Sequence, residues 1–302
     1  MSTASSPSIA LHDLTKFYGK NRGIRSVSFE VYPNEVFGFL GPNGAGKTTT
    51  IRTLMGLIKA TSGSAKILGI NALNSHHQLR KEIGYLPGVF STYSNYTASE
   101  FLHFVARMRK VNCTATINEY AERLNVDLTR HIHDLSKGNR QKVGVIYAFM
   151  HKPKVLFLDE PTSGLDPLVQ REFEKILNEA QARGASIVLS SHVLSEVENL
   201  ADRIAIINEG EIVVVERISV LKEKALRSID LYFDSPMNAT QFAGVSRLRD
   251  IFVDGELVRC TVTGSEYELL KRAVEHGVVT VHTHEPSLDE IFHEFVKVGK
   301  PQ

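Results

Sequence analysis

The chain has 302 residues, and its 35 lysines and arginines nearly balance its 34 aspartates and glutamates, which gives a formal net charge of +1. A chain of this length is expected to form one large or two ordinary domains. With 42% hydrophobic and 23% charged residues, its composition argues against a collagen-like or highly charged disordered chain. The near-zero net charge argues against a protein that binds nucleic acid through a large basic field.

The cysteines and the apolar runs indicate a reducing compartment and no membrane span. Cys113 and Cys260 are the two cysteines and lie far apart, which predicts neither a disulfide framework nor a cysteine zinc site. Residues 1–11 lack the charged and apolar regions of a secretory signal. The longest run without a strongly polar residue, 143–150, is far shorter than the roughly 20 residues that span a bilayer. The chain is therefore expected not to cross a membrane by itself.

The first 150 residues predict two strands, then a strand, a loop and a helix, and then a helical insertion. Short alternating apolar stretches at Ile9–Leu11 and Val27–Val31 are typical of the half-buried strands of an antiparallel hairpin. Glu35–Leu40 is a short apolar strand, and Lys47–Lys59 carries apolar residues at helical spacing. The pattern from Tyr93 to Met150 is mostly helical, without a convincing strand.

The next part of the chain has the βαβ pattern of a parallel sheet. Val155–Leu158 and Ser186–Leu189 are apolar runs, separated by the helix-like segment Val169–Arg183. Ile204–Ile207 and Glu211–Val215 follow, joined by a short glycine-containing turn, and predict a hairpin.

The pattern changes near residue 218. Beyond it, strand-like and helix-like segments alternate at Ile229–Phe233, Leu257–Val262, Glu266–Glu275, Val278–His282 and Leu288–Val296. We therefore predict an α/β fold in residues 1–217, with a parallel-sheet core, an antiparallel β subdomain and a helical subdomain at about residues 90–150. Residues 218–302 are predicted to form a small α+β domain.

The glycine-rich loop satisfies G-x-x-x-x-G-K-[ST] between a strand and a helix, the context that a phosphate-binding loop requires. It consists of Gly41, Pro42, Asn43, Gly44, Ala45, Gly46, Lys47, Thr48 and Thr49. Inward-pointing backbone N–H groups and the helix N-terminus are expected to hold the β- and γ-phosphates of a nucleotide. Lys47 is expected to pair with the same oxygens and Thr48 to ligate Mg²⁺. An ordinary glycine-rich turn is the alternative, and the Lys-Thr pair disfavours it.

Two acids end the apolar strand Val155–Leu158. Asp159 is expected at the C-terminal edge of the sheet, as a partner of Mg²⁺. Glu160 is a candidate general base, because a carboxylate beside an anionic phosphate can take a proton from water. The alternative is a pair of solvated strand-end charges, which the phosphate loop upstream makes the weaker interpretation.

Between these two motifs lies Leu135–Gln141, which begins with Leu-Ser-Lys-Gly-Asn. It resembles the signature motif of the ATP-binding-cassette (ABC) superfamily, whose usual form is Leu-Ser-Gly-Gly-Gln. Further segments follow in the order of that family. Pro161–Asp166 resembles its D-loop, and Ser190–His192 resembles the segment of its switch histidine. Tyr18 lies where the family carries the aromatic residue that stacks on adenine, so the resemblance covers about residues 8–217.

The resemblance implies an ATPase that works as a dimer with two ATP molecules at the interface. Ser136 and Gly138, at a helix N-terminus with free N–H groups, are implied to bind the γ-phosphate held by a second copy or by a homologous cassette. His192 is implied to contact the γ-phosphate, and Asp166 to belong to the ATP site. ATP and Mg²⁺ are the expected cofactors. The expected catalytic residues are Glu160, His192 and Lys47.

The sequence departs from the family pattern at two places. Lys137 and Asn139 replace the usual glycine and glutamine of the signature, a form that resembles exporters of the drug and antibiotic self-resistance group. Gly88 stands where the family commonly has a glutamine that touches Mg²⁺ and links the nucleotide to the helical subdomain. Water or a neighbour such as Ser91 is then needed to fill that place. Because the candidate base and the switch histidine are both present, we do not interpret the site as inactive.

Two further features carry less information. His131-x-His133 and His282-x-His284 lack a second cluster that would complete tetrahedral metal coordination, so we interpret them as incidental. Ser287 is predicted to cap a final helix. This C-terminal ending resembles the extension of exporter cassettes, and stabilisation of the fold or dimer and ligand sensing are both open roles for it.

We therefore expect an ATP-binding subunit, peripheral at the cytoplasmic face of the cell membrane, that drives export of a drug-like, peptide or lipid substrate through separate integral-membrane permease subunits. A soluble ABC ATPase of translation or DNA repair is one alternative. The chain lacks the second cassette, long coiled coil or zinc-binding cysteines that those relatives usually carry. An importer ATPase is another, since the direction of transport rests on analogy. No nucleic acid is expected as a partner, and the motifs identify neither the substrate nor a homodimer over a heterodimer.

Overall fold

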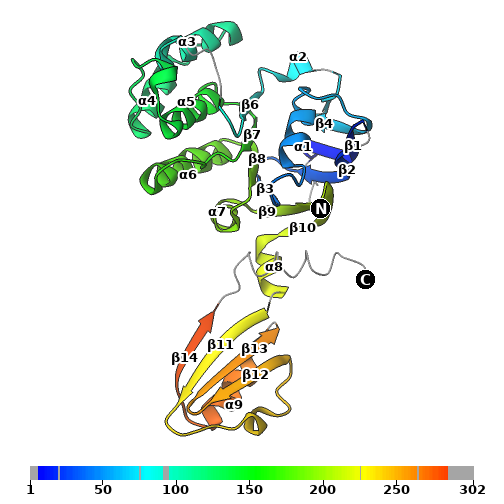
Figure 1. Cartoon of the computed structure of the whole chain (residues 1–302), viewed down its shortest axis with the longest axis vertical. Coiled ribbons are helices and arrows are strands. Elements are labelled where there is room, and N and C mark those ends of the chain that lie inside the picture. Colours follow the sequence, from blue (N-terminus) through cyan, green and yellow to red (C-terminus); the bar gives the residue numbers. More distant parts are fainter. Residues whose placement is uncertain are drawn as a thin grey trace. The chain divides into compact units, whose positions relative to one another are not determined.

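The computed structural model describes residues 6–19, 21–74, 76–90, 95–224, 226–263 and 265–284. The chain forms two compact units, Met1–Val215 and Glu216–Gln302, whereas the sequence predicts a boundary after residue 217. Figure 1 labels most of the helices and strands of both units. No helix in the described part of the chain is both long and apolar enough to span a bilayer.

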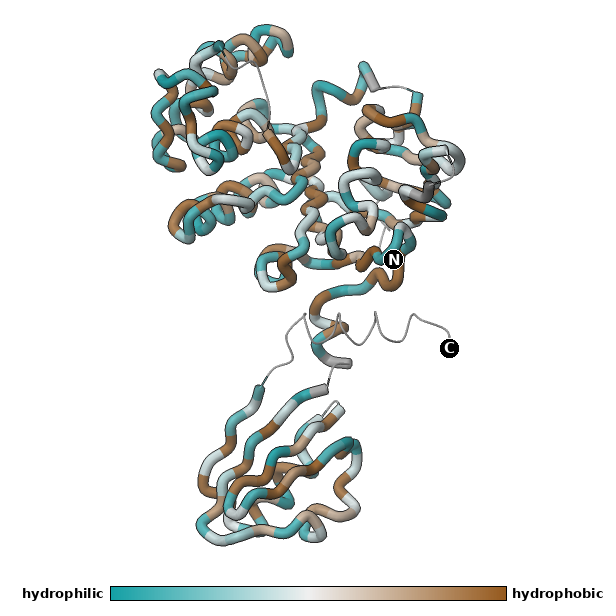
Figure 2. Tube along the Cα trace, viewed as in Figure 1, coloured by the Kyte–Doolittle hydropathy of each residue, from teal (hydrophilic) through white to brown (hydrophobic). Residues whose placement is uncertain are grey.

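A six-stranded sheet with the order β10-β9-β3-β8-β7-β6 forms the centre of the first unit (Figure 1). Its strands are β3 Val36–Leu40, β6 Ile83–Leu86, β7 Val155–Asp159, β8 Ser186–Ser191, β9 Arg203–Asn208 and β10 Glu211–Arg217. From β9 to β6 the neighbouring strands are parallel. Every residue of β3, β7 and β8 is buried, as expected for the apolar runs of a parallel core, and hydrophobic residues gather in these strands in Figure 2. The predicted parallel core is confirmed.

The helices of the core include α1 Lys47–Leu54, α2 His76–Leu79, α6 Pro167–Ala182 and α7 Leu194–Leu200. Helix α6 connects β7 to β8 and buries Phe173, Ile176 and Leu177 along one face, so the predicted βαβ unit is confirmed. The predicted helix Lys47–Lys59 was too long. Helix α1 ends at Leu54 because the chain turns through Gly56, whose φ is 67°.

An antiparallel sheet with the order β2-β1-β4-β5 completes the first unit. Its strands are β1 Ile9–Tyr18, β2 Asn21–Val31, β4 Ser62–Ile67 and β5 Ile70–Asn71. The pairing of β1 with β2 confirms the predicted hairpin. Phe29 of β2 and Phe37 of β3 stack with ring centroids 4.8 Å apart, and one hydrophobic cluster includes residues of both sheets.

The helical subdomain contains α3 Ala98–Arg109, α4 Thr114–Arg123, a 3₁₀ turn at Ile132–Asp134 and α5 Lys137–Phe149 (Figure 1). Thr97 and Glu100 form a capping box at the start of α3. No strand lies within the described residues 95–150. The predicted helical insertion is therefore confirmed.

Arg123 joins the helical subdomain to the core. From α4, its guanidinium donates to Glu172 at 2.7 Å and to Glu179 at 2.8 and 2.9 Å, and both carboxylates lie on α6. Hydrogen bonds to Glu179 and then to Glu172 raise the pKa of Arg123, and the same bonds lower the pKa of both carboxyl groups. This forked geometry gives the contact between α4 and α6 a fixed orientation.

The second unit is a small α+β fold, as predicted. It contains α8 Ile218–Lys224, α9 Tyr267–Glu275 and a four-stranded antiparallel sheet with the order β12-β13-β11-β14. The strands are β11 Leu226–Phe233, β12 Leu248–Asp254, β13 Leu257–Thr263 and β14 Val278–His284. Strand β12 and helix α8 were not predicted, and the predicted helix Leu288–Val296 with its cap Ser287 lies outside the described residues.

Side chains alternate across the sheet of the second unit. Ile229 and Leu231 of β11 belong to the same hydrophobic cluster as Leu269 and Ala273 of α9. Asp230, between them in the strand, accepts two hydrogen bonds from Arg259 at 2.7 and 2.9 Å. The second unit therefore has a hydrophobic core of its own.

Candidate functional site

The glycine-rich loop and the residues after β7 and β8 line one pocket at the C-terminal ends of the central strands. The volume of this pocket is about 290 Å³. It is lined by Pro42, Asn43, Gly44, Gly46, Lys47, Thr48, Thr49, Gly88, Glu160, Ser163 and His192. Parallel strands bring these distant segments together because their carboxyl ends meet at one edge of the sheet.

The loop has the backbone geometry of an anion site. Gly44 and Gly46 have φ values of 82° and 114°, and a Cβ atom on Gly46 would lie 2.6 Å from Ile24 Cγ2, so this position requires glycine. Helix α1 begins directly after it, with neither a capping side chain nor an acidic residue in its first turn. The positive end of the helix dipole is thus free to act on an anion.

Lys47 is the cation of the pocket. Its side chain is 6% exposed, and Nζ donates to the carbonyl oxygens of Gly41 at 2.6 Å and Pro42 at 3.3 Å. Nζ also lies 3.6 Å from Glu160 Oε1. Burial lowers the pKa of Lys47, against the opposing effect of the nearby acids. A phosphate offers this ammonium a stronger, charged partner than the two carbonyls do.

Asp159 is held by two hydroxyl groups. Thr48 Oγ1 donates to its Oδ2 at 2.8 Å, and Ser190 Oγ donates to its Oδ1 at 2.5 Å. A hydroxyl and a carboxylate in contact beside a phosphate loop form a donor set that suits Mg²⁺, which takes one or two protein oxygens and completes its shell with phosphates and water. A Cβ atom on Gly88 would lie 3.5 Å from Asp159 Oδ2, so Gly88 adjoins the same carboxylate. Ser91, the suggested substitute for the missing glutamine, lies outside the described residues.

Glu160 and His192 both line the pocket and contact each other. His192 Nδ1 lies 2.6 Å from Glu160 Oε2, and because a carboxylate only accepts, the histidine donates this bond. The φ of Glu160 is 52°, a left-handed conformation that a glutamate rarely adopts. This turn ends the strand and directs the side chain into the pocket. Glu160 can therefore accept a proton from water while the hydrogen bond from His192 holds its carboxylate in one orientation.

The signature residues lie outside this pocket and contact the D-loop segment of their own chain. Ser136 caps α5 by accepting a hydrogen bond from the Asn139 backbone N–H at 3.2 Å. A Cβ atom on Gly138 would lie 2.6 Å from the carbonyl oxygen of Gly164. Lys137 Nζ donates to Ser163 Oγ at 3.3 Å. The signature and the pocket are therefore connected through the D-loop segment.

Tyr18 and Asp166 are also outside the residues that line the pocket. Tyr18 ends β1 with 47% of its surface exposed, and Lys16 Nζ lies 5.1 Å from its ring centroid. Asp166 Oδ1 accepts from the backbone N–H groups of Leu168 and Val169 at 3.1 and 3.0 Å and so caps α6. Both side chains remain accessible to a nucleotide or partner.

Two polar residues beside the site were missed in the sequence. Gln141 is 4% exposed, and its Nε2 donates to the carbonyl oxygens of Glu160 at 3.3 Å and Pro161 at 3.0 Å. Glu196 also contacts the D-loop segment. Their positions, two residues after the signature and four after His192, were the only available signal.

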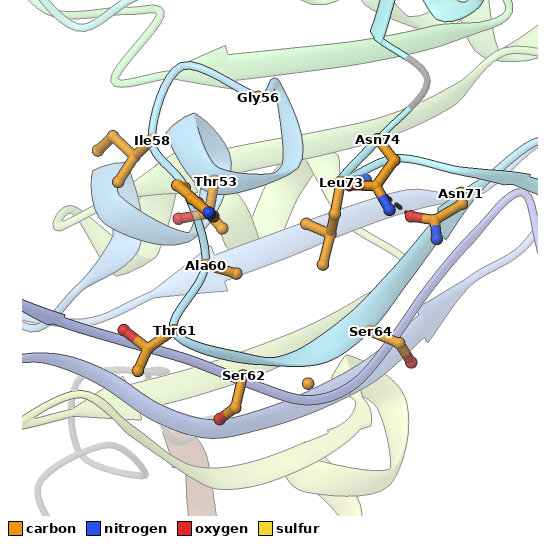
Figure 3. A pocket seen from close by; sticks show the side chains of 12 residues that line it. Thr53, Gly56, Ile58, Ala60, Thr61, Ser62, Ser64, Asn71, Leu73 and Asn74 are labelled. Atoms are coloured by element: carbon orange, nitrogen blue, oxygen red, sulfur yellow. Dashed lines mark hydrogen bonds between the residues drawn. The ribbon is translucent and has the colours of Figure 1, made fainter.

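A larger pocket of about 450 Å³ lies between the end of α1 and strands β4 and β5. Figure 3 shows small hydroxyl and amide side chains along it, such as Thr53, Ser64 and Asn71, and Lys59 is its one titratable residue.

The rings of His131 and His133 stack with centroids 5.5 Å apart. Within the described ranges, no three His, Cys, Asp or Glu side chains gather as a metal site would require.

Comparison with known proteins decides between the families that share a phosphate loop. The family described as ABC transporter matches residues 24–163. The bacitracin transport ATP-binding protein BcrA of Bacillus licheniformis is 33% identical over 296 residues, which cover 95% of this chain and 96% of that protein. The chain belongs to the ABC transporter family.

Other members agree with this assignment. BcrA of Enterococcus faecalis is 31% identical to this ABC protein over 294 residues, covering 96% of the chain and 89% of the relative. A solved structure described as the ATP binding subunit of an ABC transporter superposes with a TM-score of 0.68 at 28% identity, covering 71% of this chain and 91% of the other. The family resemblance and the α/β fold class expected from the sequence are confirmed.

The chain is thus the ATP-binding subunit of an ABC transporter and an ATPase. Membership of this family implies that the chain binds ATP. As a class, such subunits work in pairs and with membrane permeases.

Proposed function

We propose that this ABC ATPase acts at the cytoplasmic face of the cell membrane and powers export of a drug-like, peptide or lipid substrate through separate permease subunits. The similarity to two proteins named for bacitracin transport supports this, because it extends over both units of the chain. Lys137 and Asn139 in the signature also support export, because this form of the signature resembles that of drug and antibiotic exporters. An importer is the alternative that these observations favour less.

The catalytic part of the proposal rests on one observation. Lys47, Thr48, Glu160 and His192 line one pocket, and Asp159 adjoins it through its hydrogen bond from Thr48. The loop N–H groups and Lys47 bind the β- and γ-phosphates of ATP. Thr48 and Asp159 hold Mg²⁺, which when bound neutralises charge on the transferred phosphoryl group.

Glu160 takes the proton of the attacking water. Because His192 occupies Oε2 at 2.6 Å, Oε1 is the oxygen left to accept, 3.6 Å from Lys47 Nζ. A fixed carboxylate aligns the water with the phosphorus atom, and general base catalysis of this kind contributes roughly 10²- to 10⁴-fold in rate. Lys47 and the loop stabilise the charge that moves to the β-phosphate.

The proposed ATP site is completed by a second copy of the chain or a homologous cassette. Neither Ser136 nor Gly138 lines the pocket of its own chain, which supports a role toward the γ-phosphate held by the partner. Asp166 contacts the partner at the same interface, and Tyr18, half exposed beyond the loop, stacks on adenine.

Co-purification tests the transporter assignment. A tagged full chain, extracted from membranes in mild detergent, is expected to bring down an integral-membrane protein with several apolar spans. A matched sample treated with high salt before extraction controls for adsorption, since charge-driven contacts weaken with salt. Recovery of ribosomes or DNA instead of a membrane protein would favour the soluble ATPase of translation or DNA repair and contradict the proposal.

A further inference from the structure

Glu196 connects two segments of the nucleotide site that are far apart in the sequence. Its Oε2 accepts hydrogen bonds from Thr162 Oγ1 at 2.8 Å and from Ser191 Oγ at 3.1 Å. Thr162 lies two residues after Glu160, and Ser191 directly precedes His192. One carboxylate oxygen therefore joins the segment of the acid to the segment of the histidine.

The two residues that donate these bonds are buried, and Glu196 itself is half-buried. Thr162 is 7% exposed and Ser191 is 1% exposed. A buried hydroxyl left without its acceptor is unfavourable, because it has already lost its contacts with water. Ser191 Oγ also accepts from the backbone N–H of Val193 at 3.0 Å, which closes the turn that contains His192. The bond to Glu196 thus orients the hydroxyl that shapes this turn.

Glu196 is itself held in place by the packing of its helix. It lies in the first turn of α7, between the buried residues Leu194 and Val197. Its side chain is absent from the residues that line the pocket, and its Oε2 contacts Thr162 and Ser191 instead. Any effect that it has on hydrolysis passes through the residues that it holds.

We infer that Glu196 is a positioning residue for ATP hydrolysis, which fixes the D-loop segment against the switch segment so that His192 keeps its bond to Glu160. The inference rests on the proposed roles of Glu160 and His192. Its physical basis is the sensitivity of catalysis to geometry, since a displacement of about 1 Å can cost about 10²-fold in rate.

Steady-state ATP hydrolysis by the full chain provides the first test. Glu196→Ala removes the acceptor of both hydroxyl groups and is expected to lower kcat roughly 10- to 100-fold, with the KM for ATP changed less than about threefold. Glu196→Gln keeps a carbonyl oxygen in the same place and is expected to retain kcat within about threefold. Ser195→Ala, on the exposed side of the same helix, is the matched control and should hydrolyse ATP like the wild type.

A double-mutant cycle separates positioning from a general loss of stability. In single-turnover assays, Glu196→Ala is expected to cost little in a His192→Ala background, because the residue acts through the histidine. Equal losses in both backgrounds would overturn the inference. If circular dichroism finds Glu196→Ala unfolded, Thr162→Val is tested instead in the wild type and in His192→Ala. A small loss of rate in the His192→Ala background would again support the inference, and equal losses in both backgrounds would overturn it.

Glu160→Gln in the same assay distinguishes a failure of the inference from a failure of the proposed function. If Glu160→Gln loses turnover while Glu196→Ala hydrolyses ATP at the wild-type rate, the positioning role is wrong and the role of Glu160 stands. Unchanged turnover in Glu160→Gln overturns both.

Discussion

The backbone of Glu160 has a φ of 52°, in the left-handed region that costs a residue with a Cβ atom about 1–2 kcal/mol. The neighbouring strand compensates, because the Glu160 N–H donates to the Ser190 carbonyl oxygen at 3.1 Å. The strand pairing therefore continues to the acid while its side chain turns toward His192. Strain of this kind collects at functional sites, which agrees with the proposed role of Glu160 as the base.

A second unusual residue, His151, affects stability. Burial, and then the charge of Arg109, lower the pKa of His151 from 6.5 to about 4, and its Nδ1 has no hydrogen-bond partner among the described residues. Between these two pKa values the unfolded chain binds a proton at this position and the folded chain does not. The contribution of His151 to the free energy of unfolding is therefore fully present above pH 6.5. It is lost as the pH falls toward about 4.

We predict that His151→Gln reduces the pH dependence of stability. From pH 7.5 to pH 5, the free energy of unfolding of the wild type should fall by about 2 kcal/mol more than that of the variant. Urea denaturation at the two pH values measures this difference. His131→Gln, at an exposed position, is the control, and equal pH dependence in wild type and His151→Gln would contradict the prediction.

At the scale of elements, the longer apolar runs were predicted from the sequence, whereas the short buried strand β6 and the weakly patterned strands were not. All five residues of β7 are buried, and its apolar run was recognised. Strand β4 buries only Ala65 and Ile67, and β12 has no fully buried residue. These two strands form because a neighbouring strand pairs with them. Such pairing depends on tertiary contacts, which a local sequence pattern does not reveal.

Some residues of the candidate site could likewise be predicted from the sequence, and others could not. Lys47, Glu160 and His192 lie in motifs with fixed spacing, so the sequence could nominate them. Gln141 could not be nominated, because its contacts are backbone carbonyl groups that α5 reaches only after it packs beside the end of β7. Gly88 was recognised as a departure from the family, but its approach to Asp159 follows from the meeting of β6 and β7.

The contact that Arg123 makes between α4 and α6 is expected to stabilise the fold. Arg123→Ala should lower the free energy of unfolding by about 1 kcal/mol, a modest value because solvent partly screens its pairs with Glu172 and Glu179. Arg123→Lys should recover little, since an ammonium cannot reproduce the forked geometry. In the control Glu119→Ala, the loss of one exposed partner at 3.3 Å should cost less than about 0.5 kcal/mol. Equal losses on urea denaturation would contradict a specific role for the contact between α4 and α6.

At the scale of the whole molecule, each unit has a hydrophobic core among the residues that the structure describes. The phosphate loop, both acids and His192 all lie in the first unit. We propose the boundary after residue 217, so that ATP binding needs only residues 1–217.

A fragment of residues 1–217 is therefore expected to fold and bind ATP. In thermal unfolding, ATP with Mg²⁺ should raise the Tm of the fragment and of the full chain alike, because a ligand that binds only the folded state stabilises it. Lys47→Ala in the fragment should abolish the shift without preventing folding. A soluble fragment whose Tm does not respond to ATP would show that the second unit contributes to the site.

We propose that Glu160 is the base of an ATPase that hydrolyses ATP in a dimer. ATP turnover by the Glu160→Gln full chain, with the molecular mass followed by light scattering, is the decisive experiment. We predict that the variant binds ATP, accumulates as a dimer in its presence and hydrolyses it about 10²- to 10⁴-fold more slowly than the wild type. Turnover at the wild-type rate would contradict the claim.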